Sequence, residues 1–209
     1  MYNFSTKVSK TTASLNDCLL TGPSLTEKLG ISLVKFRTQQ FAFVADIEKA
    51  FLQVGLQPHH RDFTRFLWLE DPFDEFSPIK TYRFTSVLFG ATCSPFLLQM
   101  TLQYHFSQSE NQYAKLLSSS FYVDNLQGTS DNSTDLLGIY DTVNAELGKA
   151  GMILKQWNTN SDDLKFHIKC ADSEIEFPIV NNVLGLEWDT TMDTLSLKPC
   201  KFQKIKFLT

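Results

Sequence analysis

The sequence predicts an α+β fold, in which an antiparallel sheet carries helices packed on one face. Short β-prone runs rich in aromatic and branched residues alternate with longer segments whose apolar residues recur at helical spacing. The β-prone runs come in hairpin-like pairs, without the regular strand–helix–strand rhythm of a parallel sheet. Together these two observations favour the α+β class.

In the first half of the chain, the predicted elements begin after a polar stretch, residues 1–16, that is irregular or a frayed strand. A helix is expected over residues 25–37, because Ser24 and Glu27 match a capping box and apolar residues follow at helical spacing. The next predicted elements are a buried strand at 41–47, a short helix before Gly55, and two strands at 63–70 and 80–87 joined by a loop.

In the second half, Pro95 suits the first turn of a helix, where its missing N–H costs nothing, and a helix is expected over residues 96–108. Gly151 is a good end for an amphipathic helix that starts near residue 133. The remaining predicted elements are a tight hairpin from 121–125 and 126–131, a strand at 152–158, and two strands around a turn within 181–197.

Composition sets broad limits on function. The 209 residues suit one large domain or two small ones, and a net charge of −4 does not indicate a nucleic-acid binder, although a local basic patch is compatible with it. The four cysteines form no CxxC pair, which disfavours a zinc site and fits a reducing compartment. There is no apolar signal segment and no apolar run of about 20 residues. The chain is expected to be cytoplasmic, not secreted, with no membrane partner.

Two acids stand out by position. Asp46 ends the predicted buried strand, and Asp124 lies at the predicted tight hairpin. Acids at the ends of neighbouring strands can converge, and Mg²⁺ is bound by one or two carboxylates with water and phosphate completing its shell. An acid after a strand is also a common turn former or helix cap. Spacing alone leaves both interpretations open.

Motifs in a fixed order add to this pattern. The segments FVADIEKAFLQVGL, SVLFGATCSPFLLQ and FYVDN resemble the core motifs of a reverse transcriptase, and AELGKAGMILKQWNTNS and VLGLEWDTTMDTLSL continue the match. The longer string from SLNDCLLTGPSLTEKL to FVADIEKAFLQVGLQPHHRDFTRFLW is similar to the BEL/Pao class of LTR retrotransposons. The resemblance runs from about Tyr2 to about Leu197.

The resemblance implies a polymerase palm with partial fingers that performs RNA-directed DNA synthesis with Mg²⁺ or Mn²⁺. The implied partners are an RNA or DNA template with its primer, and deoxynucleoside triphosphates. The chain is expected to be a fragment of a Pol polyprotein whose other domains it lacks. The implied organisation is partial fingers at 1–40, a palm at 41–200 with a fingers insertion at about 56–86, and the start of a truncated thumb at 201–209.

The resemblance also assigns the metal-binding and catalytic positions. Asp46 and Asp124 correspond to metal ligands, with the Ile47 carbonyl nearby and Asn125 assisting. Asn125 departs from the family pattern, which has a second aspartate there; an amide oxygen coordinates Mg²⁺ but brings no charge. Phe51 corresponds to a steric gate that clashes with a ribose 2′-hydroxyl. Core packing is the alternative role for Phe51.

Further positions follow in the same way. Phe89 and Gly90 correspond to the nucleotide pocket, where glycine permits close approach, although a strand-to-helix turn also explains the glycine. Lys155 corresponds to a lysine near the leaving pyrophosphate, as general acid or positive charge, with a solvated surface lysine as the alternative. Leu184, Gly185 and Leu186 match the hairpin that grips the primer end. Phosphate contacts are weakly indicated for Arg61, Arg65, Lys80 and Arg83.

Three functional hypotheses remain at this point. The first is an active RNA-directed DNA polymerase. The second is a catalytically silent palm that at most binds nucleic acid, and the third is a globular remnant without a selected role. Metal binding at Asp46 and Asp124 separates the first from the others, and salt-dependent duplex binding separates the second from the third.

Overall fold

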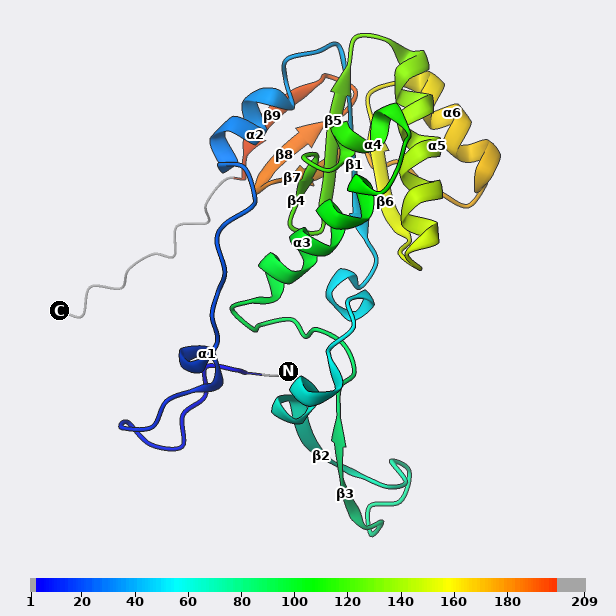
Figure 1. Cartoon of the computed structure of the whole chain (residues 1–209). Coiled ribbons are helices and arrows are strands. Elements are labelled where there is room, and N and C mark those ends of the chain that lie inside the picture. The colour runs from blue at the N-terminus through cyan, green and yellow to red at the C-terminus, as the bar shows by residue number, and fades with distance from the viewer. Residues whose placement is uncertain (1–2, 199–209) are drawn as a thin grey trace, which may run out of the picture. The chain divides into compact units, whose positions relative to one another are not determined.

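The structure is a computed structural model that describes residues 3–198 (Figure 1). The chain forms two compact units. Unit 1 takes in residues up to Glu27, then Asp46–Leu126 and Gly138–Lys155, and unit 2 takes in Lys28–Ala45, Gln127–Leu137 and residues from Gln156 onward. The segment 201–209, predicted to start a thumb, lies outside the described residues.

Helices and strands alternate along the chain. The helices are α1 (Leu15–Cys18), α2 (Leu29–Lys35), α3 (Ser94–Ser107), α4 (Gln112–Leu117), α5 (Ser133–Lys149) and α6 (Asp162–Ala171), with 3₁₀ segments η1 (Ala50–Gln53) and η2 (Pro58–Thr64). The strands are β1 (Phe41–Ile47), β2 (Arg65–Leu69), β3 (Ile79–Arg83), β4 (Phe121–Tyr122), β5 (Asn125–Ser130), β6 (Leu154–Thr159), β7 (Val180–Val183), β8 (Leu186–Asp189) and β9 (Thr194–Leu197).

The strands form three sheets. A four-stranded sheet has the order β4-β5-β1-β6, with β4 antiparallel to β5. Strands β2 and β3 form an antiparallel hairpin, and β7, β8 and β9 form an antiparallel three-stranded sheet. Helices mixed with antiparallel sheet confirm the predicted α+β class.

Strand β1 is confirmed at its predicted bounds. Four consecutive residues, 42–45, are buried, and the strand has a hydrogen-bonded neighbour on each side in the sheet. A strand covered on both faces is expected to be a continuous apolar run rather than an alternating one. The run FAFVADI therefore becomes the central strand that leads to Asp46.

Helix α3 begins as predicted, with Pro95 in its first turn. Its side chains Leu98, Leu102 and Phe106 are almost fully buried. The Phe106 ring stacks on that of Phe121 in β4, with ring centroids 5.7 Å apart. Apolar contact thus packs this helix onto the strand that precedes Asp124.

The predicted capping box at Ser24 is wrong. Helix α2 begins only at Leu29, after Lys28, whose side chain makes no capping hydrogen bond, and the Ser24 hydroxyl bonds that of Thr26 at 3.2 Å. A capping box occurs instead at α1, where Ser14 and Asp17 each accept a hydrogen bond from the other's backbone N–H. A capping pattern is short, so tertiary packing decides which copy of it starts a helix.

Several short elements were not predicted. Helices α1, α4 and α6 and the 3₁₀ segment η2 all lie in stretches without long apolar periodicity. A turn at Leu184 and Gly185 also divides the first strand predicted within 181–197 into β7 and β8. Helix α6 is started by a local cap, in which the Ser161 hydroxyl accepts from the Leu164 N–H at 3.3 Å. Among the described residues, no helix is both long and apolar enough to cross a membrane.

Unit 2 has its own core around Trp188, which is fully buried in β8. The edge of the Trp188 indole meets the Phe36 ring, with centroids 4.9 Å apart, and Ala42, Val44 and Val183 complete the cluster. Helix α2 therefore lies beside the three-stranded sheet (Figure 1). This packing explains why Phe36, just after the helix, is almost inaccessible to solvent.

We predict that Gly128→Ala destabilises the protein, whereas Gly148→Ala does not. A methyl group at Gly128 in β5 would lie 2.5 Å from the ring of Phe43, which is buried and in contact with Trp157, so the core is overpacked by about 1–3 kcal/mol. A methyl group at Gly148 in α5 meets nothing within 4 Å and favours the helix by about 0.5–1 kcal/mol. Denaturant unfolding measures both; equal effects would contradict the packing.

Candidate functional site

Asp46 and Asp124 come together at the end of β1. The Ile47 N–H donates a hydrogen bond of 3.1 Å to the Asp124 carbonyl oxygen, which joins the two segments through their backbones. Ile47 is buried, whereas both aspartates are half-buried. The structure thus brings together the two acids that the sequence singled out.

The electrostatics of the pair follow from this geometry. Burial, and then the nearby charge of Asp124, raise the pKa of Asp46 to about 6. Ionisation of one carboxyl is disfavoured beside a second carboxylate. A bound cation stabilises the ionised pair, because its positive charge offsets the repulsion between them. The pair therefore has the electrostatic character of a cation site.

The donor atoms at this place are of one chemical kind. Two carboxylates and the side-chain amide of Asn125 offer hard oxygen atoms, which suit Mg²⁺ or Mn²⁺. Across residues 3–198, no group of three or more His, Cys, Asp or Glu side chains is placed to hold a metal ion. The residues present fit a magnesium-type ion that takes its other ligands from water or phosphate, as Mg²⁺ commonly does.

The turn that carries Asp124 is strained. Tyr122 pairs with Asn125, so Val123 and Asp124 form a two-residue hairpin turn, and Val123 has φ +60°. A branched residue is rare in this left-handed region, and such a conformation costs about 1–3 kcal/mol. The surrounding structure must hold the turn in place.

Gln99 of α3 supplies that hold. Its side-chain amide, which is buried, donates to the Val123 carbonyl at 3.0 Å and to the Phe121 carbonyl at 3.4 Å. Sequence reasoning missed Gln99. A signal was available, because Gln99 is a polar residue within an apolar helical stretch.

Asn125 lies on β5 and is exposed. Its amide nitrogen donates to the Asp124 carboxylate at 3.1 Å. A second aspartate at this position has no such donor and would add a negative charge instead. The asparagine thus leaves the site with one negative charge fewer than an aspartate would give. Its hydrogen bond also orients Asp124, the acid of this hairpin turn.

Strand β6 reaches the same end of β1. The Glu48 N–H donates to the Ile153 carbonyl at 2.9 Å, and Lys155 follows two residues later with an exposed side chain. Lys155 therefore belongs to the strand that borders β1, on the side away from β5.

The predicted nucleotide-pocket residues Phe51, Phe89 and Gly90 also lie in unit 1. Phe51 is 8% exposed in η1, and its ring meets the edge of the Phe89 ring at 5.5 Å between centroids, while Phe89 itself is 71% exposed. Gly90 has φ +98°, a value that favours glycine, so the turn explanation for this residue is supported. The structure thus pairs a buried ring with an exposed one.

The loop around Gly90 is fastened by Asn16, which sequence reasoning also missed. The Asn16 side chain donates to the Gly90 carbonyl at 3.1 Å and accepts from the Thr92 N–H at 3.0 Å. An amide that satisfies both a carbonyl and an N–H of one loop restricts its backbone. No periodicity or charge pattern in the sequence marks this residue.

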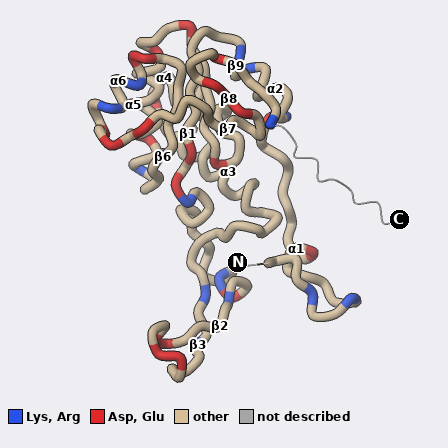
Figure 2. Tube along the Cα trace, turned by 180° about the vertical axis from the view of Figure 1, so that it is seen from behind, with Lys and Arg blue, Asp and Glu red and all other residues tan. Residues whose placement is uncertain are grey.

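The four basic residues considered for phosphate contact are engaged within the chain. Asp62 pairs with Arg65 at 2.8 Å and Arg83 at 2.5 Å, Lys80 pairs with Glu70, and Arg61 donates to the Leu56 carbonyl at 3.0 Å. The loop joining β2 and β3 is acidic (Figure 2). These observations do not favour the hairpin as a phosphate site.

Leu184, Gly185 and Leu186 lie in unit 2, whereas the two aspartates lie in unit 1. Leu184 and Gly185 form a tight turn between β7 and β8, with φ of +50° and +90°. Leu184 packs against the Trp188 core. The segment predicted to bind the primer is therefore a tight hairpin turn.

Comparison with known proteins adds to this geometry. Residues 7–159 match the sequence profile of the family described as reverse transcriptase (RNA-dependent DNA polymerase). No curated protein matches the chain.

Two solved structures resemble it: a foamy viral protease-reverse transcriptase bound to an RNA/DNA hybrid, and a form of the same viral protein designated dRH bound to double-stranded DNA. The identities are 17% and 18%, and both TM-scores are 0.56. Each match covers 85% of this chain but only 20% and 25% of the viral chains. The mixed fold with its antiparallel sheet is therefore like the palm region of those enzymes.

We predict that Asp46→Asn changes the pH dependence of stability when divalent ions are absent. Between about pH 4 and pH 6 the folded protein keeps a proton on Asp46 that the unfolded chain has lost, so the contribution of Asp46 to the stability of the wild type falls as pH rises through this range. Asparagine has no such proton. The variant should gain stability relative to the wild type from pH 4 to pH 7, as urea unfolding in EDTA would measure. Parallel stability curves would contradict the raised pKa.

Proposed function

Because the chain belongs to the reverse transcriptase family, we propose that it supplies the polymerase palm of a BEL/Pao-type LTR retrotransposon and carries out RNA-directed nucleotidyl transfer by a two-metal mechanism. The family match supports the polymerase class. The proposed BEL/Pao origin rests on the order of the motifs in the sequence and on the residues that make them up.

The observation that carries the proposal is the pairing of Asp46 with Asp124. A hydrogen bond between their segments, partial burial and a raised pKa all mark a place where two negative charges are held together. Perturbed carboxylates of this kind cluster at functional sites, because burial of like charges is costly for stability alone.

We assign the metal to Asp46 and Asp124, with the Ile47 carbonyl and the Asn125 amide oxygen as further oxygen donors. Bound there, divalent cations supply positive charge that stabilises the phosphate oxygens during transfer. The chain's part is to hold its oxygen atoms rigidly. The Gln99 hydrogen bonds and the Ile47–Asp124 bond do this for the turn.

The proposed substrates are a deoxynucleoside triphosphate and a primed RNA or DNA template. Phe51 would exclude the ribose 2′-hydroxyl, with Phe89 and Gly90 beside the nucleotide, and Lys155 would place positive charge near the leaving pyrophosphate. Leu184, Gly185 and Leu186 would contact the primer. The bound nucleic acids of the foamy viral enzymes support this class of partner.

We also propose the domain boundaries that the motifs suggest. Residues 1–40 would belong to the fingers and 41–200 to the palm, with a fingers insertion at about 56–86 that includes the β2–β3 hairpin. Other Pol domains would complete the enzyme. The chain spans a quarter or less of the viral proteins it resembles.

A second candidate function is a catalytically silent palm that only binds nucleic acid. One observation favours it: Asn125 replaces a carboxylate and donates a hydrogen bond to Asp124, so the site holds less negative charge for two dications. The silent protein would bind a duplex in a salt-dependent manner without extending a primer.

Primer extension on an RNA template decides between the two. We expect extension by the wild type with Mg²⁺ or Mn²⁺, none in EDTA, and none by Asp46→Asn. Duplex binding measured on the same samples provides the second reading. Duplex binding without extension by the wild type in either ion would favour the silent palm.

We predict opposite effects on metal affinity for two substitutions in the turn. Asn125→Asp should strengthen Mn²⁺ or Mg²⁺ binding, because it adds a carboxylate to a half-buried site, and Asp124→Asn should nearly abolish it, because Asp46 is left alone. Isothermal titration calorimetry of the wild type and both variants provides the measurement. Three equal affinities would remove the metal site from the proposal.

Phe51→Ala is predicted to relax sugar selection. Loss of the ring opens space for a 2′-hydroxyl, so the ratio of ribonucleotide to deoxynucleotide incorporation should rise at least tenfold. Phe51 is also buried, so a purely structural role predicts a loss of about 3–5 kcal/mol in stability with unchanged sugar choice. Thermal melts and single-nucleotide extension on one protein separate the two roles.

A further inference from the structure

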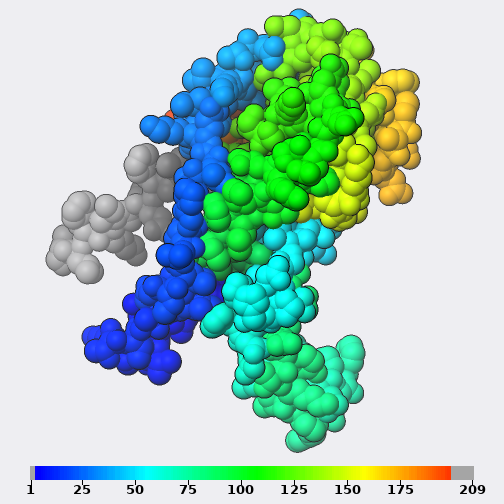
Figure 3. Space-filling view, viewed as in Figure 1, coloured from blue at the N-terminus to red at the C-terminus, as the bar shows by residue number. Residues whose placement is uncertain are grey.

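Unit 1 contains a cavity of about 670 Å³ that the proposed polymerase site does not include. Three stretches of chain form its walls: the N-terminal segment with α1, the 3₁₀ segment η2 with Leu56, and the stretch from Val87 into the first turn of α3. In Figure 3 the N-terminal segment, in dark blue, lies against residues near position 60, in cyan. The cavity therefore lies between segments that are far apart in the sequence.

The lining of the cavity is almost wholly apolar. Leu15, Leu19, Val87, Leu88 and Leu97 contribute aliphatic surface. No lysine, arginine, aspartate or glutamate lines it, and the imidazole of His60, which does, packs against the rings of His59 and Phe63. A charged ligand would lose its hydration here without meeting a lysine, arginine or carboxylate, which is costly, so the largely apolar walls select against charge.

Two polar side chains of the lining are already hydrogen-bonded. The Thr64 hydroxyl donates to the Arg61 carbonyl at 2.7 Å, and the Ser94 hydroxyl donates to the Leu88 carbonyl at 2.6 Å. Their donors are therefore committed to the protein. An occupant would be held mainly by apolar contact rather than by directed hydrogen bonds.

Aromatic rings shape the remaining surface. Phe4 is buried in the wall, while Phe63 is largely exposed and Phe96 is half-buried. The Phe96 ring packs directly on Gly22, where a β-carbon would lie 2.5 Å from it, so a ring and a glycine form this part of the cavity wall. Rings in such positions favour edge or offset stacking with a second aromatic system.

We propose that this cavity binds an uncharged aromatic small molecule. Its volume falls within the range of roughly 300–1,000 Å³ that is typical of sites for drug-sized ligands. Size, absence of charge, committed donors and aromatic walls all point to the same ligand class. The proposal does not depend on polymerase activity.

Binding here would act on the loop that carries Phe89 and Gly90. The stretch from Val87 to Ala91 contributes to the cavity wall, and the Ser94–Leu88 bond ties it to α3. A ligand packed against this wall would contact Leu88 and Ala91, which flank Phe89 and Gly90. The site thus gives small molecules a route to the surface around Phe89.

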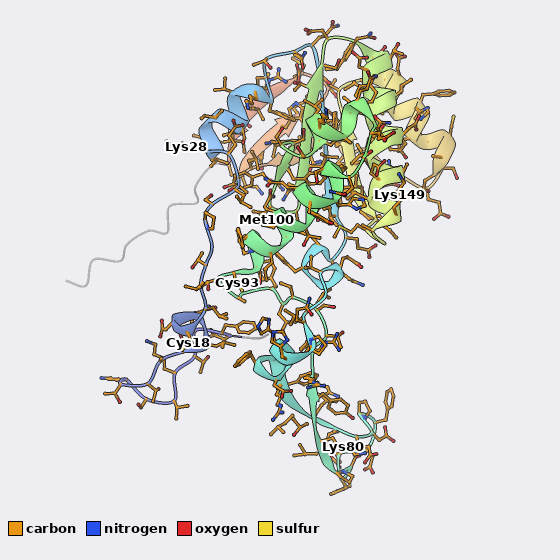
Figure 4. All side chains as sticks on the ribbon, viewed as in Figure 1. Cys18, Lys28, Lys80, Cys93, Met100 and Lys149 are labelled. Carbon is orange, nitrogen blue, oxygen red and sulfur yellow. The ribbon has the colours of Figure 1, made fainter. Side chains whose placement is uncertain are left out.

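The first test uses N-phenyl-1-naphthylamine, an uncharged aromatic probe whose fluorescence rises in apolar surroundings. We expect saturable binding with one site per chain. Cys93→Phe should weaken binding at least tenfold, because Cys93 lines the cavity at the start of α3 and a phenyl ring would occupy the space (Figure 4). Cys170→Phe is the matched control, since Cys170 is exposed on α6 outside the cavity.

A second measurement on the wild type guards against a misfolded variant. Cys18 and Cys93 both line the cavity, so saturating probe should slow their alkylation by N-ethylmaleimide, with peptide mass spectrometry resolving each thiol. Burial raises the pKa of the Cys93 thiol, so rates with and without probe are compared at one pH. Alkylation of Cys170 should not change.

Four results would overturn the proposal. One is the lack of saturable probe binding by the wild type. Another is equal probe affinity of a folded Cys93→Phe variant and the wild type. The third is equal protection of Cys170 and Cys93. The fourth is a dimer that the probe dissociates, which light scattering on the same samples would detect. That result would mean that a second copy of the chain fills the cavity.

Discussion

The hydrogen bond from the Ile47 N–H to the Asp124 carbonyl is the contact on which the candidate site depends. It holds the end of a buried central strand against a two-residue turn, and in doing so it brings two carboxylates into electrostatic contact. The end of β1 and the turn that carries Asp124 could not approach each other so closely if β1 were not apolar and covered by its neighbours. The core of the sheet thus determines where the charges lie.

That arrangement is costly for the folded state by itself. Val123 adopts a backbone conformation that branched residues avoid, and Asp46 is held partly out of water beside a second acid. Gln99 offsets the first cost with two hydrogen bonds from a buried side chain. A cation bound as proposed would offset the second cost. Such a balance is typical of sites kept for function rather than stability.

The parts of unit 1 differ in how their side chains are held in place. The rings of Phe51 and Phe89, the loop fastened by Asn16 and the acid pair are each held by short-range contacts. The β2–β3 hairpin has another character, with its cations paired to acids of the same region and an acidic connecting loop. Its lysine and arginine side chains are neutralised by neighbouring acids, which fits a structural element better than a phosphate-binding one.

The sequence by itself determined the elements with long apolar patterns and the identity of the acids. Strand β1 follows from its continuous apolar, β-prone run, and helices α3 and α5 follow from their helical periodicity. Asp46 and Asp124 were marked by motif and by their places at the end of a predicted strand and at a predicted hairpin. Local signals were weaker: the capping pattern at Ser24 starts no helix, and α4 and α6 went unpredicted. Only the tertiary structure placed Gln99 under the turn, Asn16 across the Gly90 loop, and the walls of the apolar cavity. These depend on contacts between residues up to 76 positions apart, such as Asn16 and Thr92. Local propensity and periodicity carry no information about such contacts, because they form only when packing brings distant segments together.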